Sequence, residues 1–217
     1  MNDPESEERS TRIDQLEARL SKRAPVGVLP PVAAVALVIA GWLGWTQRDD
    51  VAYFFSSRDP IGLGVEGAYR FDRAVSNRHV QLHGAPSIRG AYGLEGDQHF
   101  VVIGVQNTPL LVKRKALPTE EWKPGTTPPA PDGRSFTATG RLLSRAAASR
   151  WEDAFAKHDS FGEMSPKWLL LEGEHPGSDF TAVGVFGLVL AFALINLWLL
   201  VRGVIAMIGP RSKVRSP

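Results

Sequence analysis

The longest apolar stretch of the chain runs from Phe180 to Val201 and contains no charged residue. A helix rises 1.5 Å per residue, so this stretch would be about 33 Å long, and the hydrocarbon core of a bilayer is roughly 30 Å thick. A helix that is apolar on every face must be surrounded by protein or lipid. The pattern therefore predicts a transmembrane helix, which we place at residues 180–208.

A second uncharged stretch lies near the N-terminus, at residues 25–47, and its densest apolar part is Val32 to Trp45. Two prolines directly before that part are compatible with a helix start, because the first N–H groups of a helix have no partner there. The alternative is a signal peptide. It is disfavoured because the preceding segment is long and mixed in charge, and no small-x-small cleavage site follows. We predict an uncleaved first span.

Basic residues lie near the N-terminal end of the first predicted span and near the C-terminal end of the second. They are Arg19, Lys22 and Arg23 before the first span and Arg202, Arg211, Lys213 and Arg215 at the end of the second. The positive-inside rule then places both termini in the cytoplasm and residues 48–179 on the opposite side. Residues 1–24 are predicted to form a cytoplasmic amphipathic helix, and residues 209–217 a basic tail. Residue usage suggests a bacterial inner membrane, with a periplasmic or extracellular domain.

Between the two apolar stretches the hydrophobic period becomes two, which is typical of strands. The strands predicted from this alternation are residues 79–85, 91–94, 98–105, 109–115, 136–142 and 168–171. The segment Glu95-Gly96-Asp97 predicts a hairpin turn, and the proline-rich residues 118–133 predict a loop. Short antiparallel strands with one packed helix favour an α+β class with a small OB-like barrel.

The one helix expected in this domain has an apolar stripe in residues 147–158. We predict that Ser144 caps the helix and that Gly162 ends it. His158 lies on the stripe, so it is predicted to be a packed core histidine.

Composition narrows the chemistry. The chain has 217 residues, a net charge of +2 and no cysteine. The small charge gives no argument for nucleic acid, and the lack of cysteine excludes disulfides, thiolate catalysis, cysteine-ligated zinc and iron–sulfur clusters. No Ser–His–Asp set or G-x-S-x-G motif can be chosen. We predict no catalytic residue, no metal ligand, no cofactor and no small-molecule substrate.

Two pairs of polar residues are the main candidates for chemistry. His79 and His83 would be about 13 Å apart on a strand, too far to share an ion, so both are predicted to face solvent. Glu172 and Glu174 would be about 7 Å apart on one strand face, which suits acid–base work but is equally typical of surface carboxylates. The run Lys113-Arg114-Lys115 is predicted to be a solvated strand end.

The remaining motifs indicate structure more than chemistry. Gly62-Leu-Gly64-Val-Glu-Gly67 matches a dinucleotide fingerprint, but it lacks the strand before and the helix after, so a flexible glycine loop is predicted. Small residues and one amide in the spans are candidates for a helix–helix contact or for a contact with a membrane partner. They are Gly41, Gly44, Gly184, Gly187 and Asn196.

The layout of a helix, one exported β domain and a closing helix resembles the surfeit locus protein 1 family, membrane assembly factors for cytochrome oxidase. The local match is Thr108-Pro-Leu-Leu-Val-Lys-Arg-Lys-Ala-Leu-Pro118, followed by Thr137-Ala-Thr-Gly-Arg141. The chain departs from the family in having Lys113 for asparagine, Lys115–Ala116 for Gly-Trp, and no histidine in the second span. The resemblance implies an assembly role. It does not extend to haem handling, because the second span has no histidine.

These patterns together predict a two-pass membrane protein whose exported domain is a non-enzymatic scaffold or assembly factor for a membrane complex. Two alternatives stay open. One is a membrane-tethered, hydrolase-type enzyme with a site assembled from scattered residues such as Glu172, Glu174 or His175. The other is an envelope sensor that signals through the N-terminal helix.

Overall fold

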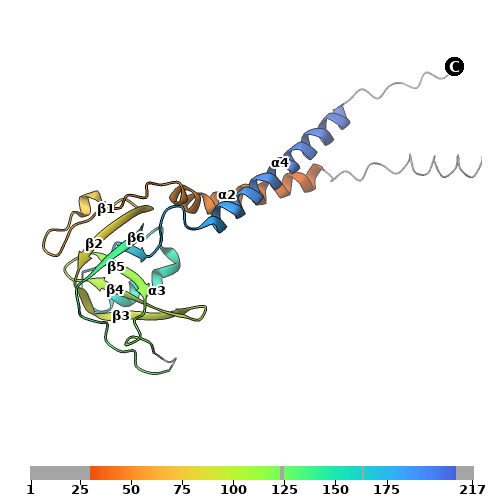
Figure 1. Cartoon of the computed structure of the whole chain (residues 1–217). Helices are drawn as coiled ribbons and strands as arrows, with labels where there is room; N and C mark the ends of the chain where they lie inside the picture. Colours follow the sequence, from red (N-terminus) through yellow and green to blue (C-terminus); the bar gives the residue numbers. More distant parts are fainter. Residues whose placement is uncertain (1–29, 123–124, 163, 209–217) are drawn as a thin grey trace, which may run out of the picture. The chain divides into compact units, whose positions relative to one another are not determined.

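A computed structural model describes residues 30–122, 125–162 and 164–208 (Figure 1). The chain divides into two compact units, one made of Met1–Thr46 with Phe186–Pro217 and the other of Gln47–Val185. The predicted N-terminal helix, the basic tail and residues 25–29 of the first predicted span lie outside the described residues.

Two long helices carry the apolar stretches. Helix α2 spans Pro30–Phe54, so it continues through the charged residues that follow the first apolar stretch. Helix α4 spans Phe180–Ile208, and Asp179 accepts a hydrogen bond from the Thr181 N–H at its start (3.0 Å). Within the described part of the chain, one helix, Phe180–Ile205, is long and apolar enough to cross a membrane by length and composition. The first span stays a prediction.

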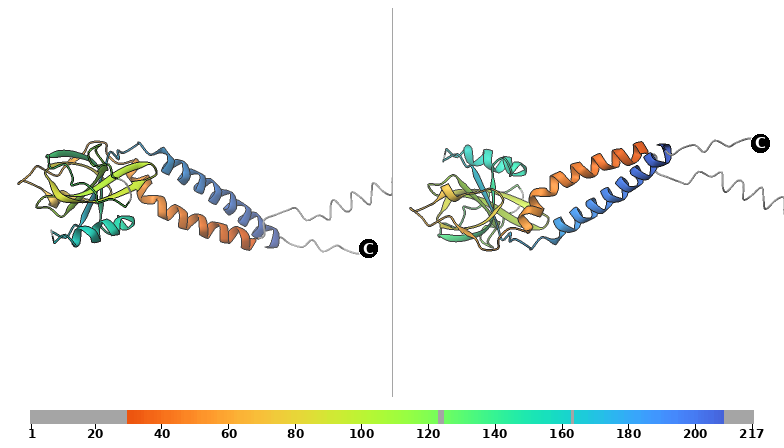
Figure 2. Two further views of the ribbon diagram at one scale, coloured as in Figure 1. Left: turned by 90° about the horizontal axis from the view of Figure 1, so that it is seen from below. Right: turned by 90° about the horizontal axis from the view of Figure 1, so that it is seen from above.

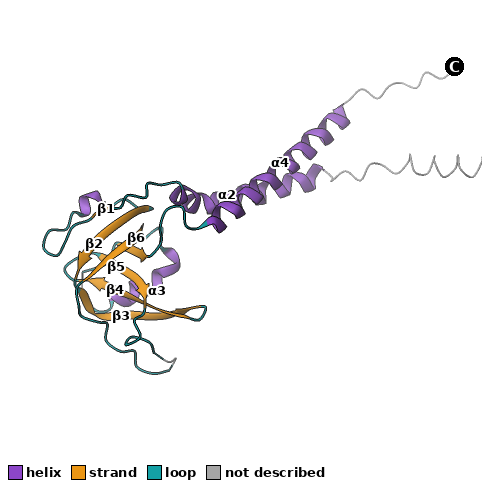
Figure 3. Ribbon diagram, in the orientation of Figure 1, coloured by secondary structure: helices purple, strands orange, loops and turns teal. Residues whose placement is uncertain are grey.

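The unit formed by Gln47–Val185 is built on a seven-stranded sheet, which confirms the predicted α+β class (Figure 3). Its strands are β1 (Ile61–Gly62), β2 (Arg78–Gly84), β3 (Pro86–Glu95), β4 (Gln98–Val105), β5 (Leu110–Lys115), β6 (Phe136–Ser144) and β7 (Trp168–Glu172). Each predicted strand corresponds to one of these, because the alternation in sequence matches the two faces of the sheet.

The strand order is β1-β2-β6-β7-β5-β4-β3. Most neighbours are antiparallel, but β5 and β7 are parallel, and so are β1 and β2. The sheet is strongly curved, as two further views show (Figure 2). The sheet is open, because β1 and β3 lie at the two ends of the strand order and do not pair with each other. The sequence instead predicts a closed or nearly closed barrel.

Apolar side chains pack on both faces of the sheet. One cluster lies on the face that α3 does not cover and draws from β2, β4, β5, β6 and β7; among its members are Val80, Ile103, Val112, Leu142 and Leu170. The other cluster includes Val102, Leu169 and the fully buried Phe155 of the short helix α3 (Glu152–Asp159). Both faces of the sheet therefore carry a packed apolar cluster, and α3 covers one of them.

The predicted role of Ser144 as the cap of the domain helix is wrong. Ser144 is the last residue of β6 rather than a helix cap, although its Oγ accepts a weak hydrogen bond from the Ala147 N–H (3.4 Å). A turn and a short 3-10 segment, Ser149–Trp151, follow before α3 begins. Strand pairing with β7 extends β6 to Ser144, so the chain needs these residues to reach the outer face. His158 is buried as predicted, with Nε2 3.0 Å from the Val102 carbonyl oxygen.

Candidate functional site

One transverse row of the sheet carries an unusual set of polar residues. His79 of β2 is opposite Arg141 of β6, Arg141 is opposite Leu171 of β7, and Leu171 is opposite Lys113 of β5. Residues paired across neighbouring strands have side chains on the same face. Strand register therefore brings His79, Arg141 and Lys113, which are far apart in the sequence, onto one face of the sheet.

Arg141 is the centre of this row, and its side chain is only 11% exposed. Its Nη1 donates to Asp50 Oδ1 (2.7 Å) and its Nε to Asn77 Oδ1 (2.8 Å). The Glu174 carboxylate lies 3.8 Å from Nη1, and the guanidinium stacks over the Tyr53 ring at 4.7 Å. We call these five residues the Arg141 cluster. A nearly buried guanidinium is stable here because acceptors and an aromatic face surround it.

The Arg141 cluster fastens two distant segments to the sheet. The Tyr53 hydroxyl donates to the Glu174 carbonyl oxygen (2.8 Å), and Tyr53 is 5% exposed. Asn77 has a left-handed backbone (φ 63°), and its amide donates to the Asp49 carbonyl oxygen (2.7 Å). The segment that enters the sheet and the segment that leaves it are thus held at the same place.

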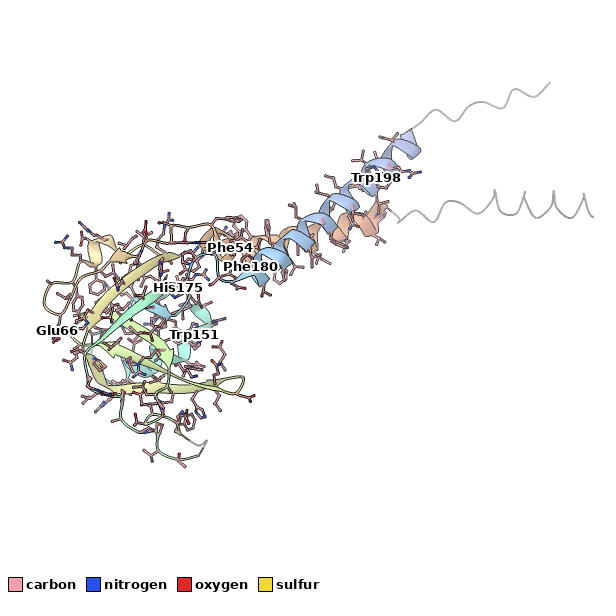
Figure 4. All side chains as sticks on the ribbon, in the orientation of Figure 1. Phe54, Glu66, Trp151, His175, Phe180 and Trp198 are labelled. Carbon is pink, nitrogen blue, oxygen red and sulfur yellow. The ribbon has the colours of Figure 1, made fainter. Side chains whose placement is uncertain are left out.

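Aromatic rings lie at the same two segments. Phe54 and Phe180 meet edge to face, with ring centroids 5.2 Å apart, and Phe54 contacts Phe55 in the same way at 5.1 Å (Figure 4). Phe55 is 73% exposed and Phe180 is 72% exposed. Phe55 and Phe180 therefore present large apolar rings at the surface, beside the start of α4.

A pair of histidines, His79 and His175, adjoins the Arg141 cluster. The prediction that His79 faces solvent is wrong. That residue is 6% exposed, and its Nδ1 lies 2.7 Å from the Arg58 carbonyl oxygen. Its Nε2 lies 3.2 Å from Nδ1 of His175, and the two rings are nearly perpendicular. His83 is exposed as predicted and contacts the Thr137 hydroxyl at 3.0 Å. His79 is buried because the turn after β7 covers it.

The two glutamates do not share a strand face as predicted. Strand β7 ends at Glu172, and Gly173 turns the chain with a left-handed φ of 83° before Glu174. Both residues nonetheless line one open hollow of about 260 Å³ between β4, β5 and the β7 turn. Burial raises the pKa of both carboxyls, although Arg114 opposes this at Glu172 and Arg141 opposes it at Glu174.

In the run Lys113-Arg114-Lys115, Lys115 is exposed as predicted, but Lys113 and Arg114 are not solvated. Lys113 pairs with Glu95 and lies 4.6 Å from the centre of the Trp151 ring. Arg114 forms a two-pronged ion pair with Glu120, whose side chain is 1% exposed. The loop after β5 folds back and supplies this carboxylate, so sequence alternation alone could not find the pair.

The residues predicted for a helix–helix contact stay a prediction. A Cβ on Gly44 would lie 3.8 Å from the Phe186 ring, whereas Gly41, Gly184 and Gly187 have open space at that position. Asn196 is 8% exposed, and its amide donates to the Phe192 carbonyl oxygen one turn earlier in α4 (2.8 Å).

The formal glycine fingerprint falls partly on β1 and partly on the loop after it. Gly64 and Gly67 have left-handed φ values of 100° and 80°, and a Cβ on Gly64 would overlap the Ala68 carbonyl oxygen. Leu63, between Gly62 and Gly64, is fully buried in the cluster that also contains Val80 and Ile103. These glycines are explained by a tight loop over the core.

Among the described residues, no group of three or more His, Asp or Glu is placed to hold a metal ion. No protein-family model matches the chain, and no curated protein or solved structure is detectably similar to it. The geometry of the Arg141 cluster and the histidine pair is therefore the main guide to function.

Proposed function

We propose that the protein is a membrane-tethered scaffold or assembly factor that acts through protein contacts. The observation that carries this proposal is the Arg141 cluster. It holds Asp50 and Tyr53 before the sheet and Glu174 after it, so both connections of the domain to the apolar segments are fixed at one point. A domain held in this way presents constant surfaces to its neighbours, which is what a scaffold requires.

The polar groups of the cluster also favour a structural role. Arg141, Asn77 and the Tyr53 hydroxyl all bind partners within the domain, so they are committed to holding segments together. A catalytic group would instead be directed to an open substrate position.

The membrane arrangement is part of the proposal. We propose two spans, with residues 48–179 in the periplasm of a bacterial inner membrane and both termini in the cytoplasm. Supporting this are the apolar helix Phe180–Ile205 and the basic residues at the outer ends of both apolar stretches. The resemblance to the surfeit locus protein 1 family points to cytochrome oxidase as the class of complex that is assembled.

We also propose that the domain is a partly open OB-like barrel. Only Ala85 separates β2 from β3, so the two count as one bent strand. This strand pairs with β6 at one end of the order and with β4 at the other. Apart from the short β1, five strands then remain, which is the number in a partly open OB barrel.

An enzyme is the second candidate, and one observation favours it. The hollow of about 260 Å³ contains Glu172 and Glu174, and burial raises the pKa of both carboxyls. A raised pKa keeps a carboxyl protonated to a higher pH than usual, and groups with shifted pKa values gather at active sites. The hollow is also lined by Lys113 and Arg114, which are paired with Glu95 and Glu120.

Crosslinking in native membranes followed by mass spectrometry tests the scaffold proposal. We expect crosslinks from the exported domain to a stable set of membrane proteins, and co-purification of that set in mild detergent. Arg141→Ala should weaken these crosslinks, whereas Arg78→Ala, on an exposed position of β2, should leave them unchanged. Crosslinks only between copies of this chain would contradict the proposal.

Alanine substitution separates the two candidates. A scaffold should keep its partner crosslinks and its phenotype with Glu172→Ala. An enzyme should lose its phenotype with that variant while the protein keeps its level and its thermal transition. The sensor alternative predicts that deletion of residues 1–20 abolishes the phenotype with the exported domain intact.

A further inference from the structure

The His79–His175 pair joins two parts of the domain that are 96 positions apart in the chain. His79 lies on β2, and His175 lies in the turn 173–179 between β7 and α4. We propose that this pair is a proton-controlled latch, which holds the turn on β2 until both imidazoles are protonated and then releases it. The inference rests on the geometry of the pair and does not depend on the scaffold proposal.

The hydrogen-bond partners fix where the protons are. The Arg58 carbonyl oxygen can only accept, so His79 carries its proton on Nδ1 and donates to it (2.7 Å). Nε2 of neutral His79 then has a lone pair and accepts from Nδ1–H of His175 (3.2 Å). This leaves Nε2 of His175 without a proton, on a residue that is exposed to solvent.

The first added proton does not open the latch. It binds at Nε2 of His175, and the imidazolium still donates its Nδ1–H to His79. A charged donor makes the hydrogen bond stronger than a neutral one does. The pair therefore holds the turn in its neutral form and more firmly with one added proton.

The second proton opens the latch. It can only bind at Nε2 of His79, because Nδ1 is already occupied by the proton that faces Arg58. Two N–H groups and two positive charges would then face each other across 3.2 Å. A donor facing a donor cannot form a hydrogen bond, and like charges at this distance repel.

The charged surroundings set how difficult the second step is. Two guanidinium groups disfavour it: Arg58 lies against Gly177 in the same turn, and Arg141 is opposite His79 on β6. Two carboxylates favour it, Glu174 beside His175 and Asp50 on α2, but both interact with Arg141. Tyr53 also lies here: its hydroxyl donates to the Glu174 carbonyl oxygen, and burial raises its pKa, so it adds no charge near neutral pH.

Release of the turn has a local consequence that can be measured. The Ser178 N–H donates to the His175 carbonyl oxygen (3.2 Å), and the Ser178 hydroxyl donates to the same oxygen. The Gly173 N–H donates to Thr139 on β6 (3.0 Å). The Ser178 bonds lie within the turn, so the amide that reports release is Gly173, which bonds to β6. If His175 leaves β2, the Gly173 amide should lose protection, whereas the amides of β4 keep theirs.

Hydrogen exchange of the full-length protein in detergent tests the latch. Protection factors of a peptide covering 173–179 are followed over a pH series that starts at about 7.5 and continues below the range in which isolated imidazoles protonate, because the first proton on the pair opposes the second. We expect protection to fall roughly tenfold or more once both imidazoles are charged, from the loss of a charge-assisted hydrogen bond. Peptides from β4 serve as the internal reference.

Two glutamine variants decide the outcome. His79→Gln removes the buried site of the second proton, so the fall in protection should disappear. His83→Gln is the matched control, because His83 lies on the same strand but contacts Thr137, and it should behave like the wild type. An unchanged fall in His79→Gln, or no fall in the wild type, would overturn the latch.

A second measurement covers the case in which His79→Gln does not fold. Nitrogen NMR of the wild type labelled at histidine reports which ring nitrogens carry protons. We expect a protonated Nδ1 and a bare Nε2 for His79 at neutral pH, and a protonated Nδ1 for His175. A His79 with its proton on Nε2 at neutral pH would overturn the proposal without any variant.

Discussion

The buried ion pair between Arg114 and Glu120 should be the most sensitive polar contact of the domain. Both carboxylate oxygens accept from the guanidinium, at 2.7 and 2.6 Å. Each oxygen also accepts one backbone N–H, from Leu117 at 2.9 Å and from Asp132 at 2.8 Å. This single carboxylate therefore satisfies four donors and ties both ends of the proline-rich loop to β5.

We predict that Glu120→Gln destabilises the domain strongly. The amide has nearly the same shape, but its NH₂ group would face a backbone N–H and a guanidinium N–H, and the charge of Arg114 would be left nearly buried. Breaking a buried pair by removing one partner costs about 3–5 kcal/mol. For a unit of this size each kcal/mol lowers the melting temperature by roughly 2–4 °C, so we expect a fall of roughly 6–20 °C.

Thermal unfolding of the full-length protein in detergent measures this effect through near-ultraviolet circular dichroism. Limited proteolysis of the loop at residues 118–133 gives a second readout, because the loop loses its attachment to β5. Glu121→Gln is the matched control, since Glu121 is exposed beside the pair and its replacement should change the melting temperature by little. A Glu120→Gln protein as stable as the control would refute the reasoning.

Three further predictions concern strand packing, acid unfolding and membrane topology. Gly140→Ala should prevent folding or lower the melting temperature sharply, because its Cβ would overlap the Leu171 carbonyl oxygen, whereas Gly62→Ala, with open space at that position, should be tolerated. Burial raises the pKa of Glu120, but hydrogen bonds from Arg114 and two backbone N–H groups outweigh it and hold the pKa below its usual value. Its contribution is therefore complete above the ordinary glutamate pKa of about 4.3 and is lost as pH falls through the lower folded value, so acid unfolding should begin below about pH 4 and shift upward without Arg114. Alkaline phosphatase fused after residue 120 should be active and fused after residue 215 inactive, and the reverse activities would contradict the proposed topology.

The fold class could be predicted from the sequence because the alternation of polar and apolar residues, and the turns that end each strand, are properties of short segments. Val80 and Leu82 alternate with polar residues, and β2 indeed buries both. The closure of the sheet could not be predicted in the same way. It depends on which strands pair, and the parallel pairing of β5 with β7 is set by packing between segments far apart in sequence.

The candidate site could not be predicted for the same reason: its residues are brought together by segments far apart in the sequence. His79 and His83 have the same spacing pattern and the same strand face, so the sequence gives no ground for treating them differently. What separates them is the residue that covers each ring: His175 from a turn after the last strand covers one, and the Thr137 hydroxyl contacts the other. In the sequence Arg141 stands out only as part of a strand motif, although it binds Asp50 and Asn77 from two earlier segments. Its role follows from the register that sets β2 beside β6, and a register between strands this distant is fixed by the whole core rather than by either strand.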